Sequence, residues 1–231
     1  VQEVMDLAIV SQLATLKTSI PFLVFFDGFR TSHELQKIDV VDYDSMGEML
    51  DQKLVEDFRK RALTPDAPRI KVGQQGPDVY FQGRETSNLH YQNAPEIIRE
   101  TMKEVGDALG RNYDLFDYEG DPEATDVIVA MGSGCETISE TIDYLNKERG
   151  MKLGMVKVRV YRPFSTKHFL EALPKSVKRI AVLDRTKEPG SIGEPLYLDV
   201  VSALQGKNIT IIGGRYGLSS KEFTPSMVLA V

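Results

Sequence analysis

The sequence predicts an α/β protein whose second half contains a parallel sheet. From residue 94 onward, short apolar runs of strand length alternate with segments in which apolar residues recur at helical spacing. Strands that alternate with helices of this length imply crossover connections and a parallel sheet covered on both faces. The first half has no such alternation. We therefore predict two domains, residues 1–93 and residues 94–231.

The first domain is predicted to begin with an amphipathic helix, because Val4, Leu7 and Leu13 recur near helical spacing. Residues 21–26 form an aromatic and β-branched run with the length of a buried strand. A polar segment follows, in which Thr31 or Ser32 is the expected start of a short helix.

Residues 45–61 predict one long helix with an apolar face, capped by Asp44 or Ser45. Residues 64–93 have no clear period and contain three prolines and three glycines. A loop of that length in a compact domain is usually functional or connects domains. The next helix is expected to begin at Ala94, with Pro95 in its first turn and Gly110 as its stop.

The second domain then alternates regularly. We expect its strands at residues 126–131, 155–161, 179–183 and 210–213. We expect its helices at residues 136–147, 166–172 and 195–204, with a last helix beginning at residue 225.

Composition excludes several classes of function. The net charge is −6 and no Lys/Arg run forms a basic stripe, which argues against nucleic acid as a partner. The longest apolar runs are far too short to cross a membrane. One cysteine excludes an internal disulfide framework and fits a reducing compartment, so the expected location is cytoplasmic. The chain opens and closes inside predicted helices, so we expect it to be cut from a longer protein.

Residues just after the strands are the natural candidates for a site, because ligands of open α/β sheets bind beyond the carboxyl ends of the strands. The segment FFDGFRTSHE (residues 25–34) follows the first predicted strand. Arg30 and Thr31 could line a site beside His33, while Asp27 holds the turn. The same residues also suit a capped helix start with Glu34 in a capping box. Both readings stay open.

Two loops of the second domain have a similar position. MGSGCET (residues 131–137) has the shape of an anion-binding turn, but it lacks the third glycine of the dinucleotide fingerprint. Simple tight turning explains its glycines as well, and Cys135 suits a small packed residue. The loop from Asp184 to Gly190, with Arg185 and Lys187, mixes both charges with proline and glycine. We interpret it as a rigid polar contact between domains.

No complete catalytic constellation is visible. The three histidines are scattered, and no Cys/His/carboxylate cluster has metal-ligand spacing. We assign no catalytic and no metal-binding residue.

Seven segments together resemble one family. They are FFDGFRTSHE (25–34), DVYFQGRE (78–85), MGSGCET (131–137), KVRVYRPF (157–164), LDRTKEPG (183–190), PLYLDV (195–200) and GRYGLSSKEF (214–223). In order and spacing they are similar to pyruvate:ferredoxin (flavodoxin) oxidoreductase, and the resemblance covers essentially the whole chain.

The resemblance implies the activity of a much longer, usually homodimeric polypeptide. Such proteins oxidise pyruvate with coenzyme A to acetyl-CoA and carbon dioxide, using thiamine diphosphate with Mg²⁺ and [4Fe-4S] clusters, and reduce ferredoxin or flavodoxin. Residues 1–93 would end the domain that binds the pyrimidine of the cofactor. Residues 94–231 would resemble the transketolase C-terminal domain.

The resemblance also implies that this chain is a structural part of the enzyme, inactive alone and without bound cofactor. The family's activating glutamate, diphosphate motif and cluster cysteines lie outside it, and a single cysteine cannot hold a four-cysteine cluster. Arg30, Thr31, His33, Asp184, Arg185 and Lys187 remain candidates for a cofactor-side or domain-interface edge. Two alternatives stay open: a subunit of a related 2-oxoacid:ferredoxin oxidoreductase, and a stand-alone interaction module.

Overall fold

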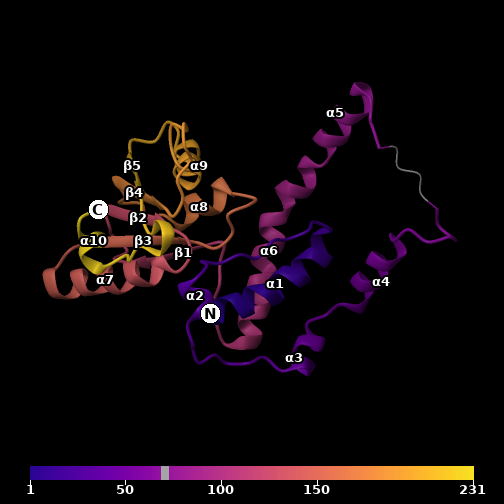
Figure 1. Cartoon of the computed structure of the whole chain (residues 1–231), viewed down its shortest axis with the longest axis horizontal. Coiled ribbons are helices and arrows are strands. Elements are labelled where there is room, and N and C mark those ends of the chain that lie inside the picture. The colour runs from indigo at the N-terminus through magenta and orange to yellow at the C-terminus, as the bar shows by residue number, and fades with distance from the viewer. Residues whose placement is uncertain (69–72) are drawn as a thin grey trace. The chain divides into compact units, whose positions relative to one another are not determined.

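The computed structural model describes residues 1–68 and 73–231 and divides into two compact units (Figure 1). Unit 1 comprises Val1–Phe25 and Gln36–Tyr113. Unit 2 comprises Phe26–Leu35 and Asp114–Val231. The predicted α/β class is confirmed by the sheet of unit 2. In the described ranges, no helix is both long and apolar enough to span a membrane.

Unit 1 is built from helices. They are α1 (Gln2–Thr18), α3 (Tyr43–Glu48), α4 (Gln52–Lys60), α5 (Pro77–Thr86) and α6 (Asn88–Leu109). Its core lies where α1 contacts α6 and includes the buried Leu13, Ile98 and Met102. At one end of this contact Lys17 forms an ion pair with Glu104 and a 3.3 Å hydrogen bond to the Thr101 hydroxyl.

Residues 21–26 do not form the predicted strand. They are extended without pairing, and the side chains of Leu23 and Phe25 are 85% and 62% exposed. Aromatic and β-branched residues favour a strand only where a neighbouring strand accepts their backbone hydrogen bonds. No strand within the described part of the chain pairs with this run.

The single helix expected over residues 45–61 is two helices, because Asp51 interrupts it. The Asp51 carboxylate accepts a 2.8 Å hydrogen bond from the Lys53 N–H, which makes it the N-cap of α4. Asp42, rather than Asp44 or Ser45, caps α3 in the same way, at 2.9 Å from the Ser45 nitrogen. An N-cap residue has non-helical backbone angles, so an internal cap divides the helix.

The long loop predicted over residues 64–93 is partly wrong. It contains α5 and the first turns of α6, while residues 69–72 of this range lie outside the described residues. Pro95 lies inside α6 rather than in its first turn. Proline removes only one N–H from the helix ladder, and the buried contacts of α6 with α1 outweigh that loss. Gly110 ends α6 in the left-handed conformation, as predicted.

The α6 helix also continues through residue 93, where the sequence predicts a domain boundary. The chain instead passes from unit 1 to unit 2 between Tyr113 and Asp114, and the earlier segment Phe26–Leu35 also belongs to unit 2. The boundary between residues 93 and 94 therefore stays a prediction about the domains of the family.

A buried carboxylate ties the start of α1 to the chain just after α6. Asp6 is fully buried and accepts hydrogen bonds from Arg111 Nε at 2.5 Å and from the Tyr113 hydroxyl at 2.6 Å. Gln2 adds a third hydrogen bond at 3.1 Å. Burial by itself raises the pKa of Asp6, but these hydrogen bonds and the Arg111 charge together hold the pKa below its usual value.

Unit 2 contains the predicted sheet. Its strands are β1 (Phe116–Gly120), β2 (Asp126–Ala130), β3 (Leu153–Val158), β4 (Arg179–Asp184) and β5 (Thr210–Arg215), in the order β1-β3-β2-β4-β5. The pairs of β2 with β3, β2 with β4, and β4 with β5 are parallel. The sequence analysis missed β1, which pairs with β3 in the antiparallel direction at the edge of the sheet. Its residues FDYEG are too polar for the pattern of a buried strand.

Helices cover both faces of this sheet, as predicted (Figure 1). The helices of unit 2 are α2 (Arg30–His33), α7 (Gly134–Arg149), α8 (Thr166–Ala172), α9 (Pro195–Ala203) and α10 (Pro225–Leu229), with a short 3₁₀ turn, η1 (Leu218–Ser220). On one face Ile138 of α7 and Val228 of α10 share a core with Met155 of β3. On the other face Phe169 of α8 meets the Phe116 ring at 5.5 Å between centroids.

This arrangement places a topological switch point between β2 and β4. The chain leaves β2 through α7 on one face, and it leaves the neighbouring strand β4 through α9 on the other face. Connections that diverge in this way open a crevice outside the carboxyl ends of the two strands.

We predict that Asp6→Asn lowers the free energy of unfolding of unit 1 at pH 7 by about 2–4 kcal/mol, because it leaves Arg111 beside a group that no longer neutralises it. The folded-state pKa of Asp6 lies below the unfolded value of about 3.9. The stabilisation is therefore present above that value and is lost as the pH falls through the folded-state pKa.

Denaturant titrations of both proteins between pH 7 and pH 3 measure this difference. The matched control is Asp107→Asn, which removes an exposed carboxylate paired with Lys103 on α6 and should change stability by less than about 0.5 kcal/mol. A difference between wild type and Asp6→Asn that stays constant down to pH 3 contradicts the assignment.

We also predict that Gly134→Ala destabilises unit 2 by roughly 1–3 kcal/mol, because a Cβ there would lie 2.5 Å from the Tyr216 hydroxyl oxygen and 2.7 Å from its ring. Thermal unfolding measures the loss. Gly28→Ala in the same unit is the control, since its Cβ would meet nothing within 4 Å. Equal melting temperatures for Gly134→Ala and wild type would refute this packing argument.

Candidate functional site

The candidate site lies at the switch point, where the turn after β2 and the loop after β4 meet. Residues 131–133 follow β2, and Arg185 follows β4. In most open α/β sheets this crevice receives a ligand. Here the segment Phe26–Leu35, which is grouped with unit 2, supplies a side chain to it.

The Asp27 carboxylate lies at the N-terminus of α7. Its Oδ2 accepts a hydrogen bond of 2.5 Å from the Ser133 backbone N–H. Gly132 has a φ of +79°, and a Cβ on it would lie 2.9 Å from the same Asp27 oxygen. Glycine at position 132 is therefore required both by the turn and by the approach of the carboxylate.

Arg185 completes the arrangement. One of its terminal nitrogens lies 3.1 Å from Asp27 Oδ1 and 3.3 Å from the Ser133 hydroxyl. Its Nε donates a 3.2 Å hydrogen bond to the Gly217 carbonyl. The Asp27 and Arg185 side chains are 13% and 24% exposed, so this ion pair is partly withdrawn from water, whereas Ser133 itself is exposed. We call Asp27, Gly132, Ser133, Arg185 and Gly217 the Asp27 cluster.

Tyr216 contacts the turn that follows β2. Its hydroxyl donates to the Met131 carbonyl at 3.2 Å, and its ring lies against Gly134. Burial raises the pKa of Tyr216, so the hydroxyl stays protonated and acts as a donor. The Phe223 ring lies 4.5 Å away between centroids. The loop after β5 is thus fixed to the turn after β2.

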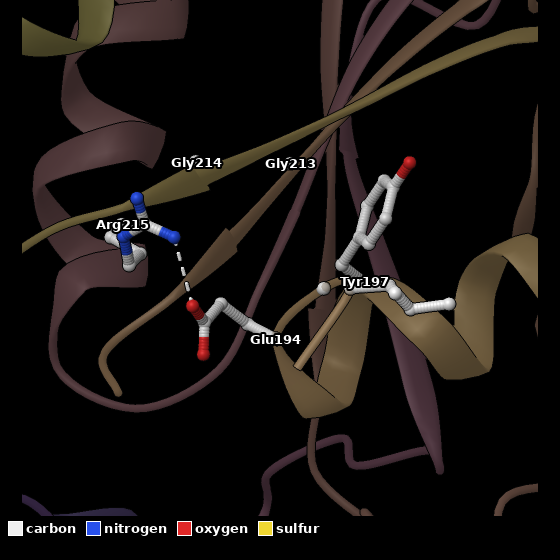
Figure 2. A pocket seen from close by; sticks show the side chains of 7 residues that line it. Glu194, Tyr197, Gly213, Gly214 and Arg215 are labelled. Atoms are coloured by element: carbon white, nitrogen blue, oxygen red, sulfur yellow. Dashed lines mark hydrogen bonds and ion pairs between the residues drawn. The ribbon is translucent and has the colours of Figure 1, made fainter. Parts of the chain in front are cut away.

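A shallow pocket of about 210 Å³ lies beside β5 (Figure 2). It is lined by Ile192, Gly193, Glu194, Tyr197, Gly213, Gly214 and Arg215. Figure 2 shows Glu194 and Arg215 pointing toward each other, and their ion pair measures 2.9 Å. The two charged side chains of the pocket therefore neutralise each other.

Glu194 has a mainly structural role in this pocket. Its carboxylate also accepts a 2.7 Å hydrogen bond from the Glu188 N–H and lies 3.8 Å from Lys187 Nζ. Burial by itself raises the pKa of Glu194, but these partners hold the pKa below its usual value. These contacts hold the two ends of the segment from Lys187 to Glu194 together.

Asp184 is buried and serves as the cap of α9. Its two oxygens accept the backbone N–H groups of Leu196 and Tyr197 at 2.9 and 3.1 Å. Burial raises the pKa of this carboxyl, and the two hydrogen bonds oppose the rise without cancelling it. The contacts of Asp184 are those of a helix cap.

The remaining candidate residues lie on α2. Arg30 forms an exposed ion pair of 3.0 Å with Glu222, and Thr31 is half-buried. His33 is exposed, 2.8 Å from the Ser32 hydroxyl. The capping-box alternative is wrong: Glu34 follows the C-terminus of this four-residue helix, and Phe29 precedes the helix with a φ of +60°. The interface role of all six candidates stays a prediction.

Sequence reasoning assigned Asp27 to its own turn and missed that it reaches Ser133, 106 positions along the chain. It named the segments that contain Ser133 and Tyr216 without giving either residue a role. The sequence did contain one signal. Residues 131–137 have the shape of an anion-binding turn but lack a phosphate-binding fingerprint, so the anion there could be a carboxylate from elsewhere in the chain. Nothing in the sequence identifies Asp27 as that carboxylate.

The cofactors that the resemblance implies need metal ligands or cluster cysteines. Within the described ranges, no group of three His, Cys, Asp or Glu side chains could hold a metal ion. The anion-binding turn of unit 2 already holds Asp27. Cys135 is the only cysteine in the sequence and is buried, so a four-cysteine cluster does not fit.

Comparison with known proteins identifies two family regions. Residues 1–103 match the family described as pyruvate flavodoxin/ferredoxin oxidoreductase, thiamine diP-binding. Residues 124–228 match pyruvate:ferredoxin oxidoreductase core domain II. The segment Phe26–Leu35 therefore falls in the range of the first family region, although its contacts are with unit 2.

Curated relatives cover the whole chain. Pyruvate:ferredoxin oxidoreductase from Moorella thermoacetica is 59% identical and pyruvate-flavodoxin oxidoreductase from Trichormus variabilis is 56% identical, in each case over 100% of this chain. The chain spans 20% of the length of each. Pyruvate dehydrogenase [NADP(+)] from Cryptosporidium parvum is 51% identical, and the chain spans 12% of it.

Among solved structures, a 2-oxoglutarate:ferredoxin oxidoreductase from Magnetococcus marinus aligns with 72% of this chain and 26% of its own, at 19% identity and a TM-score of 0.44. This likeness is too low to argue from. The family assignment rests on the two matching regions and on the curated relatives. The chain belongs to the pyruvate:ferredoxin (flavodoxin) oxidoreductase family, in which it corresponds to part of the thiamine-binding region and to core domain II.

Proposed function

We propose that the protein containing this chain oxidises pyruvate with coenzyme A to acetyl-CoA and carbon dioxide and passes the electrons to ferredoxin or flavodoxin. The observation that carries this proposal is identity of 50–59% over the whole chain to relatives named for pyruvate. Identity at this level across both family regions supports the same reaction class for the whole protein.

We propose that this chain has a structural role in the whole protein. We propose residues 1–93 as the end of the pyrimidine-binding domain and residues 94–231 as a transketolase C-terminal-like domain. Thiamine diphosphate, Mg²⁺ and [4Fe-4S] clusters would be held by other parts of the polypeptide, and a homodimer in the cytoplasm is the expected assembly. Thiamine diphosphate would supply the carbanion chemistry there, and none of its steps is assigned to residues of this chain.

The identity of the electron acceptor has a specific alternative. The Cryptosporidium parvum relative is named for NADP⁺ and is still 51% identical over the whole chain. Proteins with different named acceptors thus share this region. We infer that the acceptor is selected elsewhere in the protein, and that NADP⁺ is the second candidate.

We predict that the 231-residue chain alone does not bind thiamine diphosphate tightly and does not turn over pyruvate, because the resemblance places the family's activating glutamate and diphosphate motif outside it. Isothermal titration with thiamine diphosphate and Mg²⁺ measures the first point. Sub-micromolar binding of thiamine diphosphate would contradict the proposed structural role.

The activity itself needs the whole protein. Purified anaerobically with its clusters, it should reduce ferredoxin or flavodoxin in a reaction that requires both pyruvate and coenzyme A. NADP⁺ as the only acceptor supports the second candidate. Absence of pyruvate-dependent reduction of all three acceptors, in a preparation with full cluster content, would contradict the proposed reaction.

A further inference from the structure

The segment Phe26–Leu35 is unusual in its connectivity. The residues before and after it are grouped with unit 1, so the chain passes between the units three times, at residues 25–26, 35–36 and 113–114. The segment also falls in the thiamine-binding family region, whereas the residues that it contacts fall in core domain II. Something must therefore hold these ten residues on unit 2.

Apolar burial does not hold the segment. Phe26 and Phe29 are 48% and 69% exposed, and Leu35 is completely exposed. The α2 helix has no buried residue. Because Phe26 and Phe29 are only partly buried, the segment has little hydrophobic free energy to offset the entropy of ordering it.

Within the described part of the chain, two polar attachments join the segment to the rest of unit 2, and they differ in shielding. The Arg30–Glu222 ion pair has side chains that are 51% and 66% exposed. Pairs exposed to this degree contribute little, because water and salt screen them. The Asp27 carboxylate is 13% exposed and combines a backbone hydrogen bond with an ion pair to Arg185. A shielded, charge-assisted arrangement of this kind is much stronger.

The surroundings of Asp27 are built to receive a carboxylate. The first turn of α7 offers a backbone N–H and the positive end of a 16-residue helix. Arg185 is held toward the same point by the Gly217 carbonyl. The approach of the carboxylate requires glycine at position 132, as the Cβ distance shows.

We propose that the Asp27 cluster is a latch, and that the switch-point crevice of core domain II serves as the docking site for the segment Phe26–Leu35 of the thiamine-binding region. Asp27 takes the place that an anionic ligand has in other sheets of this kind. Asp27 and Arg185 are positioning residues in this arrangement. The latch does not depend on the proposed reaction, because it concerns only how one part of the chain is held on another.

The test is hydrogen–deuterium exchange of the intact protein, read by mass spectrometry in peptides that cover residues 26–35 and 131–137. Asp27→Asn should speed exchange in both regions by roughly tenfold or more, because it removes the charge from a shielded pair. Arg185→Gln should act in the same direction. In a double-mutant cycle, adding Arg185→Gln to Asp27→Asn should change exchange by less than about twofold, since the partners act as one unit.

Glu222→Gln is the matched control, because it removes the other attachment of the same segment. It should change exchange in residues 26–35 by no more than about threefold. Peptides that cover the buried strand β3 report global folding and should exchange equally in wild type and all variants. If Asp27→Asn also speeds exchange in β3, the double-mutant cycle decides, because additive effects of the two substitutions contradict the latch.

Two further outcomes overturn the proposal. One is exchange in residues 26–35 that is as fast in wild type as in Asp27→Asn. The other is an effect of Glu222→Gln equal to that of Asp27→Asn, which would make the exposed pair the main attachment. Loss of protection at both residues 26–35 and 131–137, confined to the Asp27 and Arg185 variants, supports the latch.

Discussion

The contact of the Asp27 carboxylate with the Ser133 N–H and the Arg185 guanidinium determines how the functional edge of unit 2 is organised. Three separate parts of the chain meet there: the ten-residue segment, the turn after β2 and the loop after β4. An uncompensated charge at this depth would be costly, so each partner needs the other two. The Arg185 bond to the Gly217 carbonyl, with Tyr216 below the turn, brings in the loop after β5 as well. The strand-end loops therefore form one connected polar structure.

This organisation gives the charged residues at the strand ends of unit 2 structural contacts. At the switch point, where an open α/β sheet ordinarily binds its ligand, the Asp27 carboxylate contacts the Ser133 N–H and Arg185. The neighbouring pocket contains a neutralised Glu194–Arg215 pair, and the buried Asp184 caps a helix. Perturbed carboxyl pKa values at a strand end are often a sign of catalysis, but here each of them has a structural cause. The chain belongs to the pyruvate:ferredoxin (flavodoxin) oxidoreductase family, and structural support is the role that we propose for it.

Much of unit 2 was predictable because β2, β3 and β4 are largely buried apolar strands. Pro195, at the start of α9, is also a clear helix signal. The polar edge strand β1 was not predictable, since an edge strand is defined by its neighbour and not by its own residues. In unit 1, residues 21–26 have the composition of a strand but no partner, and Asp51 divides a helix that apolar periodicity joins. The Asp27 contact spans 106 positions, and no local pattern encodes it. Arg185 was identified as a candidate only because it follows a strand.

A crystal structure of the intact protein tests the central claim most directly. The account predicts electron density for the Asp27 carboxylate within hydrogen-bonding distance of both the Ser133 nitrogen and the Arg185 guanidinium. It also predicts the segment Phe26–Leu35 ordered along the carboxyl edge of the β2–β4 pair. A solvent anion or cofactor phosphate on the Ser133 turn, with Asp27 turned away from Arg185, would contradict the account.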